Sequence, residues 1–191
     1  MAIKDQLAGR NHRAGWLVAS SSLVGALVAV ALGVYGRTHT PTGHPLALII
    51  GFSGMAPMKA WLTTAAVVLA AVQLVSALWM WGCLPGCGTA PFWIVHAHRW
   101  SGTLAFLVTL PVAYHCLWSI GFYDYNMRVY VHSAAGCFFY GVFASKMLAL
   151  RLRGIPGWFL PWAGGLLFVF ILVLWITASV WYFSQPGLPL I

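Results

Sequence analysis

Five stretches of the chain are apolar over about 20 residues or more, the length of helix that crosses the hydrocarbon core of a bilayer. They predict helices at roughly 15–35, 59–82, 97–119, 130–150 and 158–183. Segments rich in glycine and proline separate these stretches, and none is long enough to divide the chain into domains. We therefore expect an all-α fold in which residues 1–191 form a single transmembrane domain, an integral membrane five-helix bundle.

The composition fits a protein that lies mostly in lipid, and it narrows the classes of function. Hydrophobic residues make up 61% of the chain and charged residues only 6%, whereas soluble domains carry about 25% charged residues. There is no glutamate, and the two aspartates are Asp5 and Asp124. Proton-coupled transporters and ion pumps rely on buried carboxylates, so these classes are disfavoured. The basic residues are scattered rather than clustered, which argues against binding of nucleic acid.

The distribution of Lys and Arg predicts the orientation of the bundle, because cytoplasmic loops carry an excess of these residues. With the N-terminus in the cytoplasm, seven of them fall inside and three outside. The inner set is Lys4, Arg10, Arg13, Arg99, Lys146, Arg151 and Arg153, and the outer set is Arg37, Lys59 and Arg128. We expect the first helix, which follows a basic segment without a clear cleavage site, to be an uncleaved signal anchor.

Two histidines, His115 and His132, lie near the ends of the third and fourth predicted helices. At 1.5 Å per residue, His115 lies about 10 Å beyond the centre of its helix, and His132 lies about 12 Å from the centre of the next, antiparallel helix. Both displacements point to the outer face, so the two rings are predicted to share a depth. Two imidazoles at one depth could ligate a single haem iron, which takes axial ligands from opposite sides.

The residues around His132 also favour a haem site. Gly136 follows His132 by one helical turn and has no side chain, so a flat porphyrin could lie against the backbone there. Arg128 precedes His132 by one turn and could pair with haem propionates. The alternative interpretation is that each histidine only reaches the membrane interface or hydrogen-bonds a neighbouring helix.

His98 is the candidate ligand for a second haem nearer the inner face, since it begins the same H-x3-G pattern as His132. The 17 positions from His98 to His115 leave their side chains about 100° apart around a helix axis. One helix face therefore cannot carry both ligands, and a second haem is left open. The alternative is an interfacial pair of His98 with Arg99.

The four cysteines do not form a recognisable metal motif. Cys83 and Cys87 share a loop with C-x3-C spacing, and no second cysteine pair completes a zinc site. Cys116 and Cys137 lie within predicted helices, where cysteine behaves as a small apolar side chain.

The segments YHCLWSIGF at 114–122 and VHSAAGCFFYGVFASKML at 131–148 resemble those of b-type membrane cytochromes of the cytochrome b561 and ferric-reductase-like families. They are also similar to small five-helix bacterial membrane proteins that carry this histidine-bearing stretch. The resemblance implies transmembrane histidines that ligate haem b, in a multi-pass protein of the bacterial cytoplasmic membrane. These cytochromes commonly bind two haems through four histidines, whereas here one pair has matching depth.

The expected function is that of a haem b-binding electron-transfer protein, which relays electrons between membrane quinol or quinone and a partner redox protein. A nucleotide-binding reductase domain is absent from the sequence, so we expect an electron-transfer subunit of an oxidoreductase complex rather than a complete enzyme. The alternative is a non-redox structural or anchoring membrane subunit of a larger complex, in which the histidines only pack or hydrogen-bond.

Overall fold

The computed structural model describes residues 2–44, 49 and 51–188, and every regular element in these ranges is helical. The long helices are α1 (Ala2–Thr38), α2 (Met55–Met80), α3 (Phe92–Tyr114), α4 (Met127–Ala149) and α5 (Phe159–Trp175). A π-helical segment, η1 (His115–Ile120), continues α3, and a second, η2 (Ile176–Val180), leads from α5 into the short helix α6 (Trp181–Phe183). The predicted all-α fold is confirmed for the described residues.

Four segments are long and apolar enough to cross a membrane, namely His12–Thr38, Met55–Met80, Phe92–Ile120 and Phe159–Phe183. The chain is therefore a multi-pass helical membrane protein, and large apolar side chains such as Leu27 and Val30 of α1 are left exposed to lipid. α4 does not belong to this set, because polar residues interrupt its apolar sequence. The fifth span and the cytoplasmic N-terminus stay predictions. The side chains of Lys4 and Arg10, which entered the orientation count, lie outside the described part of the chain.

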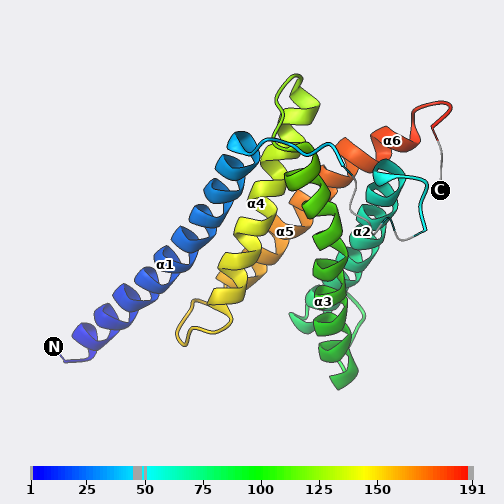
Figure 1. Cartoon of the computed structure of the whole chain (residues 1–191). Helices are drawn as coiled ribbons and strands as arrows, with labels where there is room; N and C mark the ends of the chain where they lie inside the picture. Colours follow the sequence, from blue (N-terminus) through cyan, green and yellow to red (C-terminus); the bar gives the residue numbers. More distant parts are fainter. Residues whose placement is uncertain (1, 45–48, 50, 189–191) are drawn as a thin grey trace.

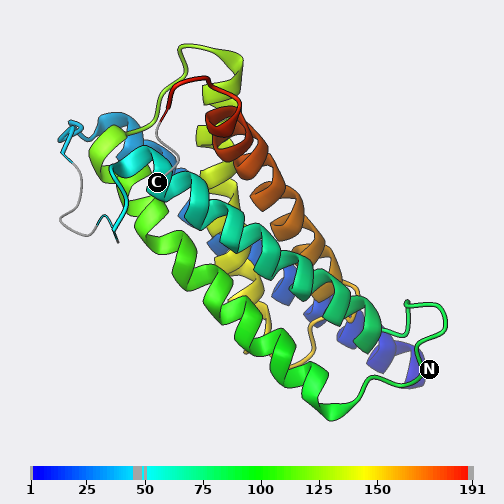
Figure 2. The same ribbon diagram turned by 90° about the vertical axis from the view of Figure 1, so that its right-hand side faces the viewer.

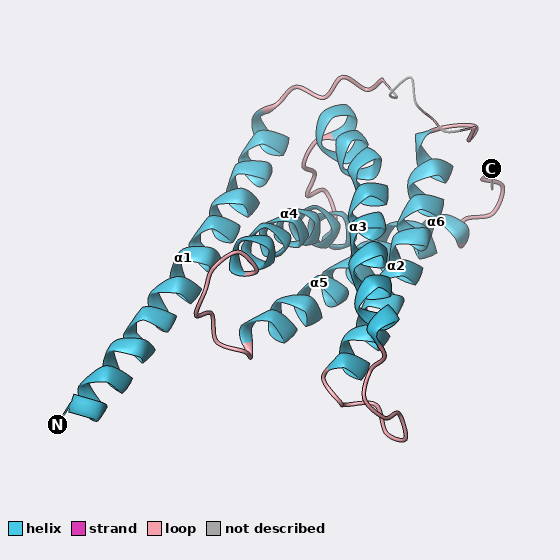
Figure 3. Cartoon of the chain, turned by 90° about the horizontal axis from the view of Figure 1, so that it is seen from below, coloured by secondary structure: helices cyan, strands magenta, loops and turns pink. Residues whose placement is uncertain are grey.

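The helices form a bundle in which α4 and α5 lie between α1 and the α2–α3 pair (Figures 1 and 3). They run along the length of the bundle with consecutive long helices antiparallel (Figure 2). The core forms where α2, α4 and α5 meet, around Ala66, Phe139 and Ile171, and Val108 of α3 packs against it. One end of the bundle therefore holds the C-terminal ends of α1, η1 and α6 together with the first turns of α2 and α4 (Figure 1).

α1 packs against α4 through a crossing of small residues. A Cβ atom on Gly25 would lie 2.6 Å from the carbonyl oxygen of Gly141, and one on Gly141 would lie 2.5 Å from the carbonyl oxygen of Gly25. Ala29 and Ser145 flank the crossing. Lipid is as apolar as the helices, so association depends on close backbone packing, which small residues permit.

Two polar contacts organise the loop between η1 and α4. The Oδ1 atom of Asn126 accepts a hydrogen bond from the backbone N–H of Val129 at 2.9 Å and caps the first turn of α4. Arg37, at the end of α1, donates to Asp124 at 2.6 Å, and both side chains are exposed. The chain thus returns to α1 before it enters α4.

The helix bounds differ from the predicted ones mainly at the ends. α1 begins at Ala2 rather than near residue 15, because residues 2–14 are rich in good helix formers such as Ala, Leu, Lys and Arg. The segments η1 and η2 were not predicted, since hydrophobic periodicity does not separate a π-turn from the α-helix around it.

Replacement of Gly141 by alanine is expected to destabilise the fold by about 1–3 kcal/mol, as overpacking does, because the new methyl group would press on the backbone of Gly25. Thermal unfolding of the purified protein in detergent measures the effect. Gly165→Ala is the matched control, because Gly165 is also helical and a Cβ there would meet no atom within 4 Å. Equal unfolding temperatures for the two variants would contradict the close crossing.

Candidate functional site

A cavity of about 330 Å³ lies at the end of the bundle where α2 and α4 begin. Its walls come from every helical element, α1 contributing Leu32, and from the loop between η1 and α4. Its volume is at the lower end of the range for pockets that bind small molecules. Most of the surface is apolar. The polar and charged side chains on its walls are Lys59, Thr63, Thr109, Tyr123, Tyr125, Arg128, His132, Ser133, Tyr140, Thr177 and Tyr182.

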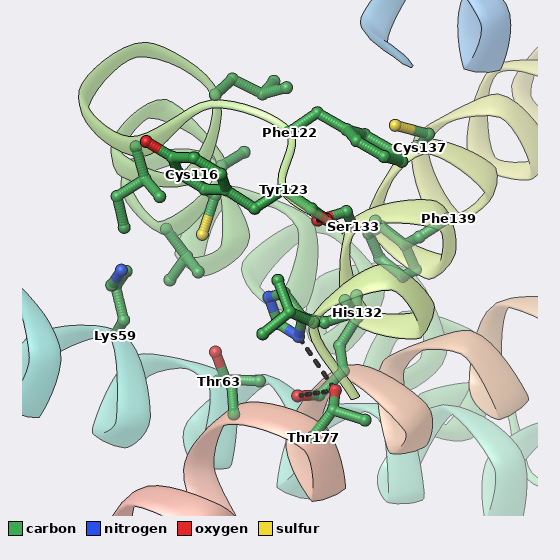
Figure 4. Close-up of a pocket in the computed structure, with 18 of the residues that line it drawn as sticks. Lys59, Thr63, Cys116, Phe122, Tyr123, His132, Ser133, Cys137, Phe139 and Thr177 are labelled. Atoms are coloured by element: carbon green, nitrogen blue, oxygen red, sulfur yellow. Dashed lines mark hydrogen bonds between the residues drawn. The ribbon is translucent and has the colours of Figure 1, made fainter. Parts of the chain in front are cut away.

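The ring of His132 lines this cavity and is held by Thr177 of η2 (Figure 4). The Nδ1 atom of His132 lies 2.9 Å from Oγ1 of Thr177, and that hydroxyl donates its one proton to the carbonyl oxygen of Val173 at 2.6 Å. With that proton on Val173, Nδ1 is the donor in the bond with Thr177, the assignment that satisfies both contacts. It follows that the other ring nitrogen, Nε2, carries the lone pair, and Figure 4 shows it turned away from Thr177.

Arg128 also hydrogen-bonds Thr177, at its backbone carbonyl oxygen. Its Nη1 atom donates to the carbonyl oxygen of Thr177 at 2.6 Å, and its guanidinium lies 3.9 Å from the ring centroid of Trp181. A π-turn disturbs the regular α-helical hydrogen bonds, and such turns are frequent at functional sites. His132 and Arg128 thus fasten α4 to the π-helical part of the last span, next to the cavity.

Gly136 also lines the cavity, one turn below His132, as predicted from its spacing. A Cβ atom added there would meet only Leu174, at 3.8 Å. Nearby, the hydroxyl of Tyr140 donates to Thr109 of α3, whose Oγ1 and carbonyl oxygen lie 2.9 and 3.0 Å away. Gly136 therefore leaves room for a Cβ atom on this wall, which is bounded by a tyrosine that is already hydrogen-bonded.

His115 lies at the same end of the bundle, at the start of η1, but it is not among the residues that line the cavity. It is completely buried, and its Nδ1 donates to the carbonyl oxygen of Pro111 at 2.8 Å. The next residue, Cys116, faces the cavity, and consecutive residues of a helix point about 100° apart. The structure thus does not bring His115 and His132 to one cavity wall, and their joint ligation of a metal stays a prediction.

His98 lies toward the other end of the bundle, within a polar cluster between α2 and α3. Its Nδ1 is 2.9 Å from Oγ of Ser76, which itself donates to the carbonyl oxygen of Val72 at 2.6 Å. By the same reasoning as for His132, Nδ1 is the donor and Nε2 carries the lone pair. The amide of Gln73 completes the cluster with hydrogen bonds to Ser101 and to the carbonyl oxygen of His98.

His39 and the two loop cysteines lie apart from the cavity. His39 stacks on Tyr35 with a centroid distance of 5.0 Å, and its Nε2 lies 3.2 Å from the carbonyl oxygen of Trp118. Cys83 and Cys87 are exposed and unpaired in the loop after α2. Among the described residues no group of three or more His, Cys, Asp or Glu side chains could hold a metal ion by itself.

Two residues of the site were missed by the sequence analysis. Thr177 lies in an apolar stretch, and nothing in the sequence marks its hydroxyl as the partner of His132. Lys59 entered only the count of charges for orientation, yet it lines the cavity. Its position at the start of an apolar span in a nearly acid-free chain was the available signal.

Residues 17–190 match a family of unknown function, DUF6529, and the chain belongs to that family. No curated protein and no solved structure matches the chain.

Replacement of Thr177 by valine, which keeps the shape but removes the hydroxyl, is expected to cost about 1–3 kcal/mol of stability because it leaves the Nδ1–H of His132 without its acceptor. Thr177→Ser retains the hydroxyl and should stay close to the wild type. Thermal unfolding in detergent compares the two variants. If valine were tolerated as well as serine, Thr177 would not be what holds the ring.

Proposed function

We propose that this member of the DUF6529 family binds haem b in the cavity and relays single electrons within the membrane. The observation that carries the proposal is the state of His132: Nδ1 is committed to Thr177, and Nε2 presents its lone pair beside an apolar cavity. Histidines that ligate metals donate their other ring N–H to a neighbouring acceptor in the same way, which fixes the tautomer and the ring orientation. His115 and His98 also donate from Nδ1.

The other cavity residues fit a porphyrin. The space beside Gly136 would receive an edge or face of a flat ring, and aromatic and aliphatic walls would exclude water from it. The guanidinium of Arg128 lines the cavity and would pair with a propionate. Haem iron exchanges one electron between two oxidation states, and burial, ligand identity and hydrogen bonds to the ligand set its potential. The residues of this chain would supply that ligation, burial and orientation.

The proposed partners follow from the location of the site. A cavity within a lipid-embedded bundle suits exchange of electrons with membrane quinol or quinone, and a partner redox protein would act as the second redox partner. The chain would then work as an electron-transfer subunit in the bacterial cytoplasmic membrane. His115 stays the proposed second axial ligand, and His98 is the candidate for a second haem.

The purified protein, expressed with adequate haem supply, should be red and give a b-type pyridine haemochrome with about one haem per chain. His132→Ala should lower the haem content about tenfold or more, since even partners of ligands change affinity by 10- to 100-fold. His39→Ala is the control, because His39 lies outside the cavity. Colourless wild-type protein would contradict the proposal and leave the structural or anchoring role.

His115→Ala should convert a low-spin spectrum to high-spin if His115 is the second ligand.

Gly136→Leu is expected to abolish haem binding without unfolding the protein. The new Cβ would meet one atom, on Leu174, at an ordinary van der Waals distance of 3.8 Å, and the rest of the side chain would enter the cavity that Gly136 lines, so the fold should tolerate it. Haem content by pyridine haemochrome and thermal unfolding in detergent measure the two effects separately. Full haem content in this variant would show that haem is bound elsewhere.

A further inference from the structure

The charges around the cavity are all positive. Lys59 reaches it from α2 and Arg128 from α4, and no Asp or Glu is among the residues that line it. The chain has only two carboxylate side chains. Asp124 pairs with Arg37 on the surface, and Asp5 belongs to the start of α1, at the far end of the bundle from the first turn of α2 (Figure 1). The cavity therefore lacks a counter-charge from its own described residues.

Arg128 also lies in the first turn of a helix, where the helix dipole is positive and disfavours a cation. Lys59 is in the second turn of α2, which has no acidic residue in its first turn, and Arg128 is in the first turn of α4, which has none either. In a partly apolar setting, buried charges normally find a partner of opposite sign. The arrangement would be unfavourable if the cavity received a neutral ligand, and it becomes favourable with an anionic one.

The two cations differ in the contacts that they already make within the protein. Arg128 donates to Thr177 and stacks on Trp181, so its position is fixed by the protein. Lys59 forms no ion pair and no hydrogen bond within the described residues, and it is only partly exposed. In Figure 4 its amine projects from α2 above Thr63, on the same side as the unprotonated nitrogen of His132.

We infer that Lys59 is a binding residue for a carboxylate of the cavity ligand, and that the ligand is therefore an anionic amphiphile whose apolar body fills the cavity while its carboxylates meet Lys59 and Arg128. The inference rests on the proposed function, because a porphyrin with two propionates is a ligand of this class. In this role Lys59 makes the cavity bind a porphyrin with charged carboxylates more tightly than the same ring without charge. Ligation by His132 is separate from this interaction.

The test uses iron-free protoporphyrin IX, which has two carboxylates and needs no axial ligand, and its dimethyl ester, which has the same ring and no charge. Binding of each to the full-length protein in detergent is followed by porphyrin fluorescence. The wild type should bind the free acid more tightly than the ester. Lys59→Gln should weaken binding of the free acid about tenfold, the effect of losing one charge-assisted hydrogen bond, and should leave binding of the ester unchanged.

Two further variants complete the comparison. Lys59→Arg keeps the charge and should bind the free acid within about threefold of the wild type, as a retained ion pair implies. Lys146→Gln removes a cation from α4 that does not line the cavity, and it should bind both porphyrins as the wild type does.

Equal binding of the free acid by the wild type and Lys59→Gln would overturn the inference, and so would an equal loss of both porphyrins in Lys59→Gln. In either case a wild type that still takes up haem through His132 leaves the proposed function standing. A wild type that binds neither haem nor porphyrin overturns both.

Discussion

Two side chains of α4 donate hydrogen bonds to Thr177, and the arrangement of the cavity depends on these two bonds. Its hydroxyl accepts from His132, and its carbonyl oxygen accepts from Arg128. The hydroxyl can accept from the imidazole because its own proton is bonded within the helix, to Val173. One residue thereby fixes the tautomer of the histidine, the position of the guanidinium and the contact of α4 with the last span.

The rest of the bundle is held by similar small polar and steric contacts rather than by a large core. Serine and threonine side chains along the helices bond to carbonyl oxygens one turn back, as Ser76 and Thr109 do. These hydroxyls can then accept a second bond from a neighbouring helix, which is how His98 and Tyr140 reach their partners. On the opposite side, the Gly25–Gly141 crossing brings two backbones together without any polar bond.

The sequence allowed much of the fold to be predicted, because long apolar stretches separated by glycine and proline leave few alternatives to membrane helices. It also allowed His132, Gly136 and Arg128 to be predicted on one helix face, since that inference needs only helical periodicity, and all three line the cavity. The direction in which the side chain of His115 points could not be predicted in this way. Depth along a helix follows from residue number, but rotation about the axis relative to another helix depends on packing. Thr177 and Lys59 were missed for the same reason, because their importance comes from helices far away in the chain.

The π-helical segment η2 makes the site sensitive to chain length as well as to residue type. Each residue of an α-helix advances about 100° around the axis, and a π-turn accommodates one residue more than an α-turn does. Deletion of a single residue between Trp175 and Trp181 would let the segment close into a regular α-helix. Because the π-turn already holds the extra residue, its closure would leave the facing of the residues beyond it about the same, so Trp181 would stay near Arg128 and Tyr182 at the cavity wall. A one-residue change in length at this point would therefore act on the site through Thr177, which lies within the turn and holds His132 and Arg128.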